Sequence, residues 1–178
     1  MAGGLPRVWG ATDEEVVRRY PADDLYDFPA RAMTRAVSVA APAALTYRWM
    51  CQVAVAPYSY DLLDNRGHRS PTTLTLGADD LRVGQRVMIF ELTEVEPGHH
   101  WTGRTVGGPR RVFGDLAMTY AAEPAGRDAS RLLCRIAFPV PGRLARVRAE
   151  ALSWGDLVMM RKQLLTLKRL AERDARGL

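Results

Sequence analysis

Short runs in which apolar and polar residues alternate fill the middle of the chain, and apolar residues at helical spacing occupy its end. Over residues 33–39 the sequence MTRAVSV alternates with a period of two, which predicts a strand and places Arg35 on the same side as Met33, Val37 and Val39. Further strands are predicted at residues 72–76, 85–95, 99–106, 111–122 and 131–138, with turns at 77–80, 97–98, 107–109 and 124–126. These short connections favour an antiparallel meander, because parallel crossovers need about a dozen residues or more.

Helical patterns lie on both sides of the meander. Residues 42–53 predict an amphipathic helix that Pro57 must end, and residues 58–67 predict a second short helix stopped by glycine. The clearest helix covers residues 153–175, where apolar residues recur every three or four positions on one face. Its start, from Ser153 to Asp156, has the form of a capping box, and residues 143–152 add a preceding turn or two.

The first 32 residues predict an arm that lies over the body of the protein. Thr12 and Glu15 have the spacing of a capping box for a short helix that Pro21 ends, and residues 21–29 predict an irregular covering segment. We expect residues 33–178 to form a single α+β domain, in which a curved antiparallel sheet grips the long C-terminal helix. A sheet curved around one helix leaves a tapering space between the two.

Composition agrees with an ordinary globular domain of 178 residues, with 47% apolar and 25% charged side chains. A chain of this length buries enough surface to form a core or a cavity without disulfides or metals, so Cys51 and Cys134 are interpreted as buried thiols. Apolar stretches end well before the roughly 20 residues of a membrane span, and the first six residues do not resemble a targeting segment. We expect a cytoplasmic protein.

The net charge of +5 does not indicate a nucleic-acid partner. Residues 1–142 hold 16 basic and 16 acidic side chains, and residues 143–178 hold 9 and 4, so the excess lies on the C-terminal helix. Since no phosphate-binding loop and no stripe of alternating arginines and aromatics accompanies it, we interpret the charge as a solvated helix face.

The sequence gives little support for a metal site or for a catalytic nucleophile paired with a histidine. His99 and His100 are adjacent, so on a strand they point to opposite faces, and His68 is the only other histidine. We therefore expect no metal and no cofactor, since zinc needs three or four converging ligands.

Several stretches resemble the START-like helix-grip superfamily, which includes START lipid carriers, polyketide cyclase/dehydrase-like proteins and the birch-pollen-allergen type. They are residues 35–50, 81–87, 92–97 and 130–135. Residues 10–14, 21–25 and 58–61 resemble a bacterial subgroup of that superfamily, and the resemblance spans about residues 10 to 173. It implies a small, largely apolar or aromatic ligand in an internal cavity, with cyclase/dehydratase-type chemistry or non-catalytic carriage of a lipid or hydrophobic metabolite. A third alternative is an interaction module that uses the basic helix.

Candidate ligand-binding residues come from the helices and the predicted strands, and ordinary core packing is the alternative for each apolar one. They are Trp49, Tyr58, Tyr60, Phe90, Leu92, Trp101, Arg104, Leu116, Met118, Tyr120, Trp154, Leu157, Val158, Arg161 and Leu165. Glu91, His100 and Asp115 are the candidate catalytic groups, because each could move a proton while Tyr60 or Arg104 holds a carbonyl or enolate. Arg135 is a further polar residue within a strand. Each of these polar residues faces either the pocket or the solvent, depending on which face of its strand it lies on.

Overall fold

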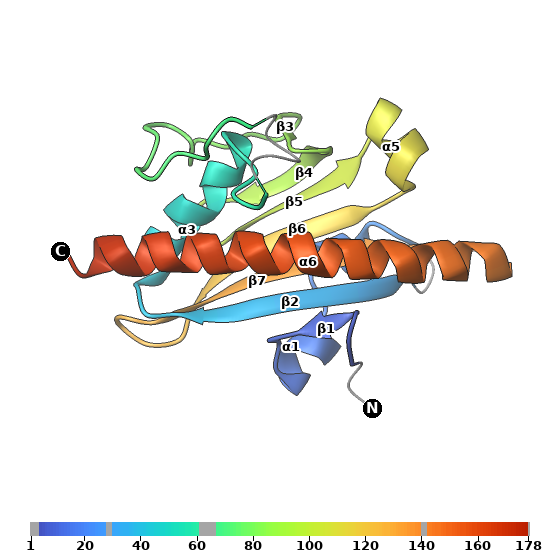
Figure 1. The fold of residues 1–178 in the computed structure, drawn as a ribbon, viewed down its shortest axis with the longest axis horizontal. Coiled ribbons are helices and arrows are strands. Elements are labelled where there is room, and N and C mark those ends of the chain that lie inside the picture. Colours follow the sequence, from blue (N-terminus) through green and yellow to red (C-terminus); the bar gives the residue numbers. More distant parts are fainter. Residues whose placement is uncertain (1–3, 28–29, 61–66, 140–141, 178) are drawn as a thin grey trace.

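One mostly antiparallel sheet and one long helix form the body of the protein (Figure 1). The computed structural model describes residues 4–27, 30–60, 67–139 and 142–177, the last range as backbone alone up to residue 148. The described strands form a seven-stranded sheet in the order β1-β2-β7-β6-β5-β4-β3. They are β1 (Val8–Trp9), β2 (Arg31–Val39), β3 (Arg86–Val87), β4 (Phe90–Glu96), β5 (His100–Thr105), β6 (Ala117–Pro124) and β7 (Ser130–Phe138). In this order each strand is antiparallel to the next, except that β1 runs parallel to β2.

Helix α6 (Gly142–Ala175) crosses the inner face of this sheet, as Figure 1 shows. Its buried side chains recur at the predicted spacing and join α3 (Ala43–Cys51) and the inner faces of β2, β6 and β7 in one core. They are Met160, Leu164, Leu167, Leu170 and Ala171. A short 3₁₀ helix, η1 (Gln52–Ala54), follows α3. The predicted α+β architecture, a curved sheet around a C-terminal helix, is confirmed.

The start of α6 differs from the prediction. Ser153 is inside the helix, where its hydroxyl donates to the carbonyl of Ala149 at 2.6 Å, so Ser153 and Asp156 form no capping box. Residues 143–152 contain neither glycine nor proline and are rich in strong helix formers, so the helix extends back to Gly142. This difference leaves Asp156 free for another role.

The meander is confirmed for residues 90–106 and 130–138, but three segments differ. The single strand predicted at 85–95 is broken after Val87 by a tight turn, in which Met88 has a positive φ, so β3 and β4 form a hairpin. The predicted turn at 107–109 and the start of the strand at 111–122 are replaced by α5 (Gly107–Phe113), in which Pro109 occupies the first turn, where a proline is tolerated. Residues 72–76 form no strand. The side-chain amide of Gln52 hydrogen-bonds both the N–H and the C=O of Thr75. It thus satisfies backbone groups that a neighbouring strand would otherwise pair with. Most of the helix predicted at 58–67 lies outside the described residues, and residues 58–60 are not helical.

The N-terminal arm covers the outer face of the sheet with more structure than predicted. The capping box of Thr12 and Glu15 at the start of α1 (Asp13–Val17) is confirmed. The arm also contains α2 (Pro21–Asp24), and β1 adds an edge strand beside β2. Glu15 binds the guanidinium of Arg131 through both carboxylate oxygens, at 2.7 and 2.8 Å. Burial alone would raise the pKa of Glu15, but hydrogen bonds from Arg131 and Thr12 leave it below its usual range.

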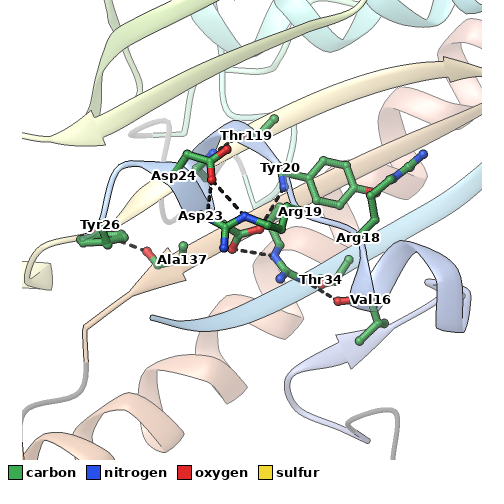
Figure 2. Close-up of polar contacts among 12 residues, drawn as sticks. Val16, Arg18, Arg19, Tyr20, Asp23, Asp24, Tyr26, Thr34, Thr119 and Ala137 are labelled. Carbon is green, nitrogen blue, oxygen red and sulfur yellow. Dashed lines mark hydrogen bonds and ion pairs between the residues drawn. The ribbon is translucent and has the colours of Figure 1, made fainter. Parts of the chain in front are cut away.

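Figure 2 shows how α2 and its flanks attach to the strands beneath them. The N–H of Ala22 donates to Thr119 Oγ1 at 2.9 Å, and the hydroxyl of Tyr26 donates to the carbonyl of Asp115 at 3.1 Å. Arg135 of β7 reaches Asp23 at 3.1 Å and the carbonyl of Val16 at 3.0 Å. Because the arm buries the outer face as well, side chains on both faces of β6 and β7 are buried.

Within the described part of the chain, no helix combines the length and apolar character that crossing a bilayer requires.

Gly10 marks the point where the arm must approach β2 closely. It has a φ of +69°, and a Cβ there would lie 2.1 Å from the carbonyl oxygen of Ala36. Gly10→Ala should lower the free energy of unfolding by about 1–3 kcal/mol, because it combines backbone strain with a clash against main chain. Urea denaturation measures the change. Gly98→Ala is the matched control, since Gly98 also has a positive φ but open space around it. An equal loss in both variants would contradict a tight junction at Gly10.

Candidate functional site

A cavity of about 1300 Å³ lies between α6 and the inner face of the sheet. Its wall is mainly apolar and comes from β2, β4, β6, β7, α6, η1, the end of α5 and the loops next to them. Large apolar members of the wall are Met33, Phe90, Met118, Ile136, Phe138 and Met160. The members that come from strands point inward, so the same alternation of side chains that builds the core also builds the wall.

Five apolar side chains of the wall, from α6, α5 and the loops at residues 55 and 88, reach the protein surface. Val55, Met88, Phe113, Leu152 and Val158 all line the cavity, and each of these side chains is more than a third exposed. Exposed apolar side chains that also line a cavity are typical of a ligand entrance. A molecule entering here would meet apolar surface first.

A buried ion pair lies next to Met33, with Asp156 in the cavity wall and Arg35 behind it. The Arg35 side chain is fully buried, and its Nη2 donates to Asp156 Oδ2 at 3.1 Å. Asp156 lines the cavity and keeps 21% of its side-chain surface exposed. Nη1 of Arg35 donates to the carbonyls of Arg7 at 2.6 Å and Thr34 at 3.3 Å, so the arm and β2 hold the guanidinium behind the carboxylate.

Burial changes the ionisation of both partners. It raises the pKa of Asp156 to about 6, because the apolar surroundings disfavour the charged carboxylate more than Arg35 stabilises it. Burial also lowers the pKa of Arg35, against the stabilising effect of Asp156. A carboxyl group with this pKa exchanges its proton near neutral pH, which is the property that acid–base chemistry requires.

Gln163 closes the end of the cavity near η1. Its side-chain oxygen accepts a hydrogen bond from the hydroxyl of Tyr120, and its Nε2 donates to the carbonyl of Pro57 and contacts Met88 Sδ at 3.8 Å. Met88 and Tyr58 are the non-glycine residues with positive φ in the described chain, at +53° and +54°. Gln163 therefore ties two strained loops to α6 at the cavity wall.

Asp115 lies at the opposite end, below α5, and is fully engaged. Its two oxygens accept hydrogen bonds from Arg104 at 2.8 and 2.6 Å, and Arg110 adds a third at 3.0 Å. The hydrogen bonds from Arg104 lower the pKa of Asp115 more than partial burial raises it. Arg104 also lies over the ring of Tyr26, 5.3 Å from its centroid. Asp115 thus remains ionised at neutral pH.

The structure distributes the predicted ligand-binding residues over three environments. In the cavity wall lie Phe90, Leu116, Met118 and Val158, together with the candidate acid Asp115. In the surrounding core, rather than the wall, lie Trp49, Tyr58, Leu92, Trp101, Tyr120 and Leu157. On the surface lie Tyr60, Trp154, Leu165 and Arg161, the last over the ring of Trp9. Aromatic identity alone did not separate wall from core, because both environments are apolar.

Three polar candidates occupy the outer face of the sheet. Glu91 lies between the inward residues Phe90 and Leu92, so it points away from the cavity. His100 contacts the carboxylates of Glu94 at 3.0 Å and Glu96 at 3.3 Å on that same face. Arg135, as described above, binds the arm. Their catalytic or binding roles remain predictions that this placement does not favour.

Sequence reasoning missed Arg35, Asp156 and Gln163. Asp156 was assigned to a helix cap and Gln163 was not singled out, since both look ordinary on an amphipathic helix. Arg35 gave a usable signal, because it shares its strand phase with Met33, Val37 and Val39, and a lone charge on a buried face requires a partner. No cluster of three or more potential metal ligands occurs among the described residues.

Known structures share this architecture. No family model matches the sequence, and no curated protein matches it either. Norcoclaurine synthase from Thalictrum flavum, in complex with dopamine and hydroxybenzaldehyde, superposes with a TM-score of 0.55 at 14% identity, over 81% of this chain and 87% of that one. The Zhui aromatase/cyclase from Streptomyces sp. R1128 gives 0.50 at 15% identity, over 83% and 97%. A protein from Thermobifida fusca gives 0.50 at 13% identity, over 78% and 94%.

These similarities establish the fold. The chain has a helix-grip fold, and the fold that the predicted resemblance implied is confirmed. One sheet-and-helix body in this fold carries unrelated activities, so function must be argued from the cavity itself.

The raised pKa of Asp156 predicts a pH-dependent stability. Between about pH 4 and pH 6 the folded protein holds a proton on Asp156 that the unfolded chain has released, so this group's contribution to stability falls as the pH rises through that window. Relative to Asp156→Asn, the wild type should lose about 2 kcal/mol of unfolding free energy between about pH 4 and pH 7. Urea denaturation at both pH values measures this difference. Asp128→Asn, at an exposed turn, should show no such change; a pH-independent difference for Asp156→Asn would contradict the assignment.

Proposed function

We propose that the protein binds a small, largely apolar or aromatic ligand in the cavity between α6 and the sheet. The observation that carries the proposal is the cavity itself, about 1300 Å³ in volume and lined mostly by apolar side chains. Ligand sites generally combine an apolar wall with a few fixed polar groups, and here Asp156 and Gln163 are such groups.

The volume favours a ligand larger than a single ring. An apolar cavity of roughly 150 Å³ binds one benzene molecule, so the space here accommodates several fused rings or a long chain. The norcoclaurine synthase structure holds dopamine and hydroxybenzaldehyde within the same fold, which supports a small aromatic ligand for this chain.

Thermal melting with 2-methoxynaphthalene tests the proposal. Specific binding should raise the melting temperature in a concentration-dependent manner, because a ligand that binds only the folded state stabilises it by mass action. Met159→Trp places a large ring in the cavity wall and should abolish most of the shift. Leu165→Trp, on the same helix but exposed outside the wall, should keep it. No shift in the wild type, or equal shifts in both variants, would contradict binding in this cavity.

Cyclase/dehydratase-type proton transfer is the second candidate function, and carriage without chemistry is its alternative. Asp156 supports chemistry, because it lines the cavity and has a pKa of about 6. Asp115 lines the same cavity with a lowered pKa. Two carboxyl groups whose surroundings move their pKa values apart are a common arrangement for acid–base work. In this proposal the Asp156 carboxylate removes a proton from a carbon next to a ligand carbonyl and returns it after rearrangement.

Deuterium exchange at the methylene of 1-phenylbutane-1,3-dione, followed by NMR, separates the two alternatives. Catalysed exchange should rise with pH through about 6, as Asp156 ionises, and fall by at least tenfold in Asp156→Asn. Asp128→Asn should exchange like the wild type. Loss of exchange in Asp115→Asn with retention in Asp156→Asn would assign the proton transfer to Asp115. A wild type that binds 2-methoxynaphthalene but does not accelerate exchange would favour a carrier.

A further inference from the structure

The polar groups of the cavity wall differ in how much hydrogen-bonding capacity they have left. Both oxygens of Asp115 accept from arginines, and both ends of the Gln163 amide are engaged, by Tyr120 and Pro57. The Asp156 carboxylate accepts from Arg35 through Oδ2. Among the described residues, no hydrogen bond is made to Oδ1 of Asp156, and this side chain lines the cavity.

Charge then restricts what this oxygen can receive. Arg35 and Asp156 together are neutral, so a cationic or anionic ligand would add an unpaired charge inside an apolar cavity, at a high desolvation cost. A ligand that offers only an acceptor, such as an ether, gives the carboxylate nothing to bind. A neutral hydroxyl donates a hydrogen bond without adding charge, and a hydrogen bond to an ionised acceptor is stronger than a neutral one.

We infer that Asp156 is the recognition group of the cavity and that the ligand is a neutral, largely apolar molecule with a hydroxyl group that donates to Asp156 Oδ1. This inference rests on the proposed function, because it requires a ligand in the cavity. Arg35 acts as a positioning residue: it is fully buried, holds the other carboxylate oxygen and is itself held by the carbonyls of Arg7 and Thr34.

Two probes that differ by one methyl group test the inference by calorimetric titration at pH 7.5 and pH 5. 2-Naphthol carries the hydroxyl, and 2-methoxynaphthalene has the same rings without a donor. At pH 7.5 2-naphthol should bind about tenfold more tightly, although the ether is the more apolar compound, because only the phenol donates to the carboxylate. At pH 5, where Asp156 is mostly protonated, the ratio should fall towards one.

A double variant, Arg35→Met with Asp156→Leu, removes both charges together, so no unpaired charge is left in the wall. It should bind the two probes alike at both pH values, whereas Asp128→Asn should keep the wild-type preference and its pH dependence. If the double variant fails to fold, the two probes and two pH values on the wild type decide alone.

The outcomes separate this inference from the proposed function. Measurable binding of both probes at equal affinity, or tighter binding of the ether, at pH 7.5 would overturn recognition by Asp156 and leave the apolar cavity site standing. A preference for 2-naphthol that is unchanged at pH 5, or that survives in the folded double variant, would also overturn it. Absence of binding by either probe would count against the proposed function and, with it, the inference.

Discussion

A fully buried guanidinium constrains three separate parts of this protein. Arg35 lies on β2, its carboxylate partner lies on α6, and a further acceptor, the carbonyl of Arg7, belongs to the arm just before β1. Removing one partner of such a pair typically costs about 3–5 kcal/mol, because the remaining charge is left without compensation. The arm, the sheet and the helix must therefore dock in one relative arrangement. The ion pair between Arg7 and Glu150 and the contact of Arg161 with the ring of Trp9 join the arm to α6 beside it, but both involve exposed arginines and contribute less.

The same arrangement explains how one sheet serves two purposes. The outer face of β5, β6 and β7 is sealed by the arm, through small apolar contacts and the ion pairs of Glu15 and Asp23 with Arg131 and Arg135. With that face occupied by the chain itself, the inner face can leave space unfilled beneath α6. Stability then comes from the sheet, the α3–α6 core and the arm, whereas the unfilled cavity contributes little to it.

How far the sequence predicts this structure depends on how many faces of each element are buried. The sequence of β2 alternates clearly, so the inward direction of its side chains, Arg35 included, was predictable. The capping box was also predictable, because it depends only on the four residues from Thr12 to Glu15. In β7, residues such as Leu132, Leu133 and Cys134 are all buried because the arm covers the second face, and the alternation that would fix the phase is lost. Asp156 fitted a capping box as well as a buried pair, and only the position of the helix start distinguishes the two. The cavity wall depends on the path of α6 over the sheet, which periodicity does not encode.

An open cavity with a charged group in its wall is a compromise between two opposing costs. If the wall collapsed onto Asp156, the carboxylate would lose the exposure it retains, and its pKa, already raised by burial, would rise further. If water filled the space, the apolar side chains around Met118 and Ile136 would stay hydrated. A ligand with a large apolar body and one hydrogen-bond donor relieves both costs, because its body covers the wall and its donor compensates the carboxylate. Gln163, bound to Pro57 and Met88 at one end, and Asp115, bound by Arg104 and Arg110 at the other, fix two parts of the wall, and the proposed ligand would have to satisfy both costs within that frame.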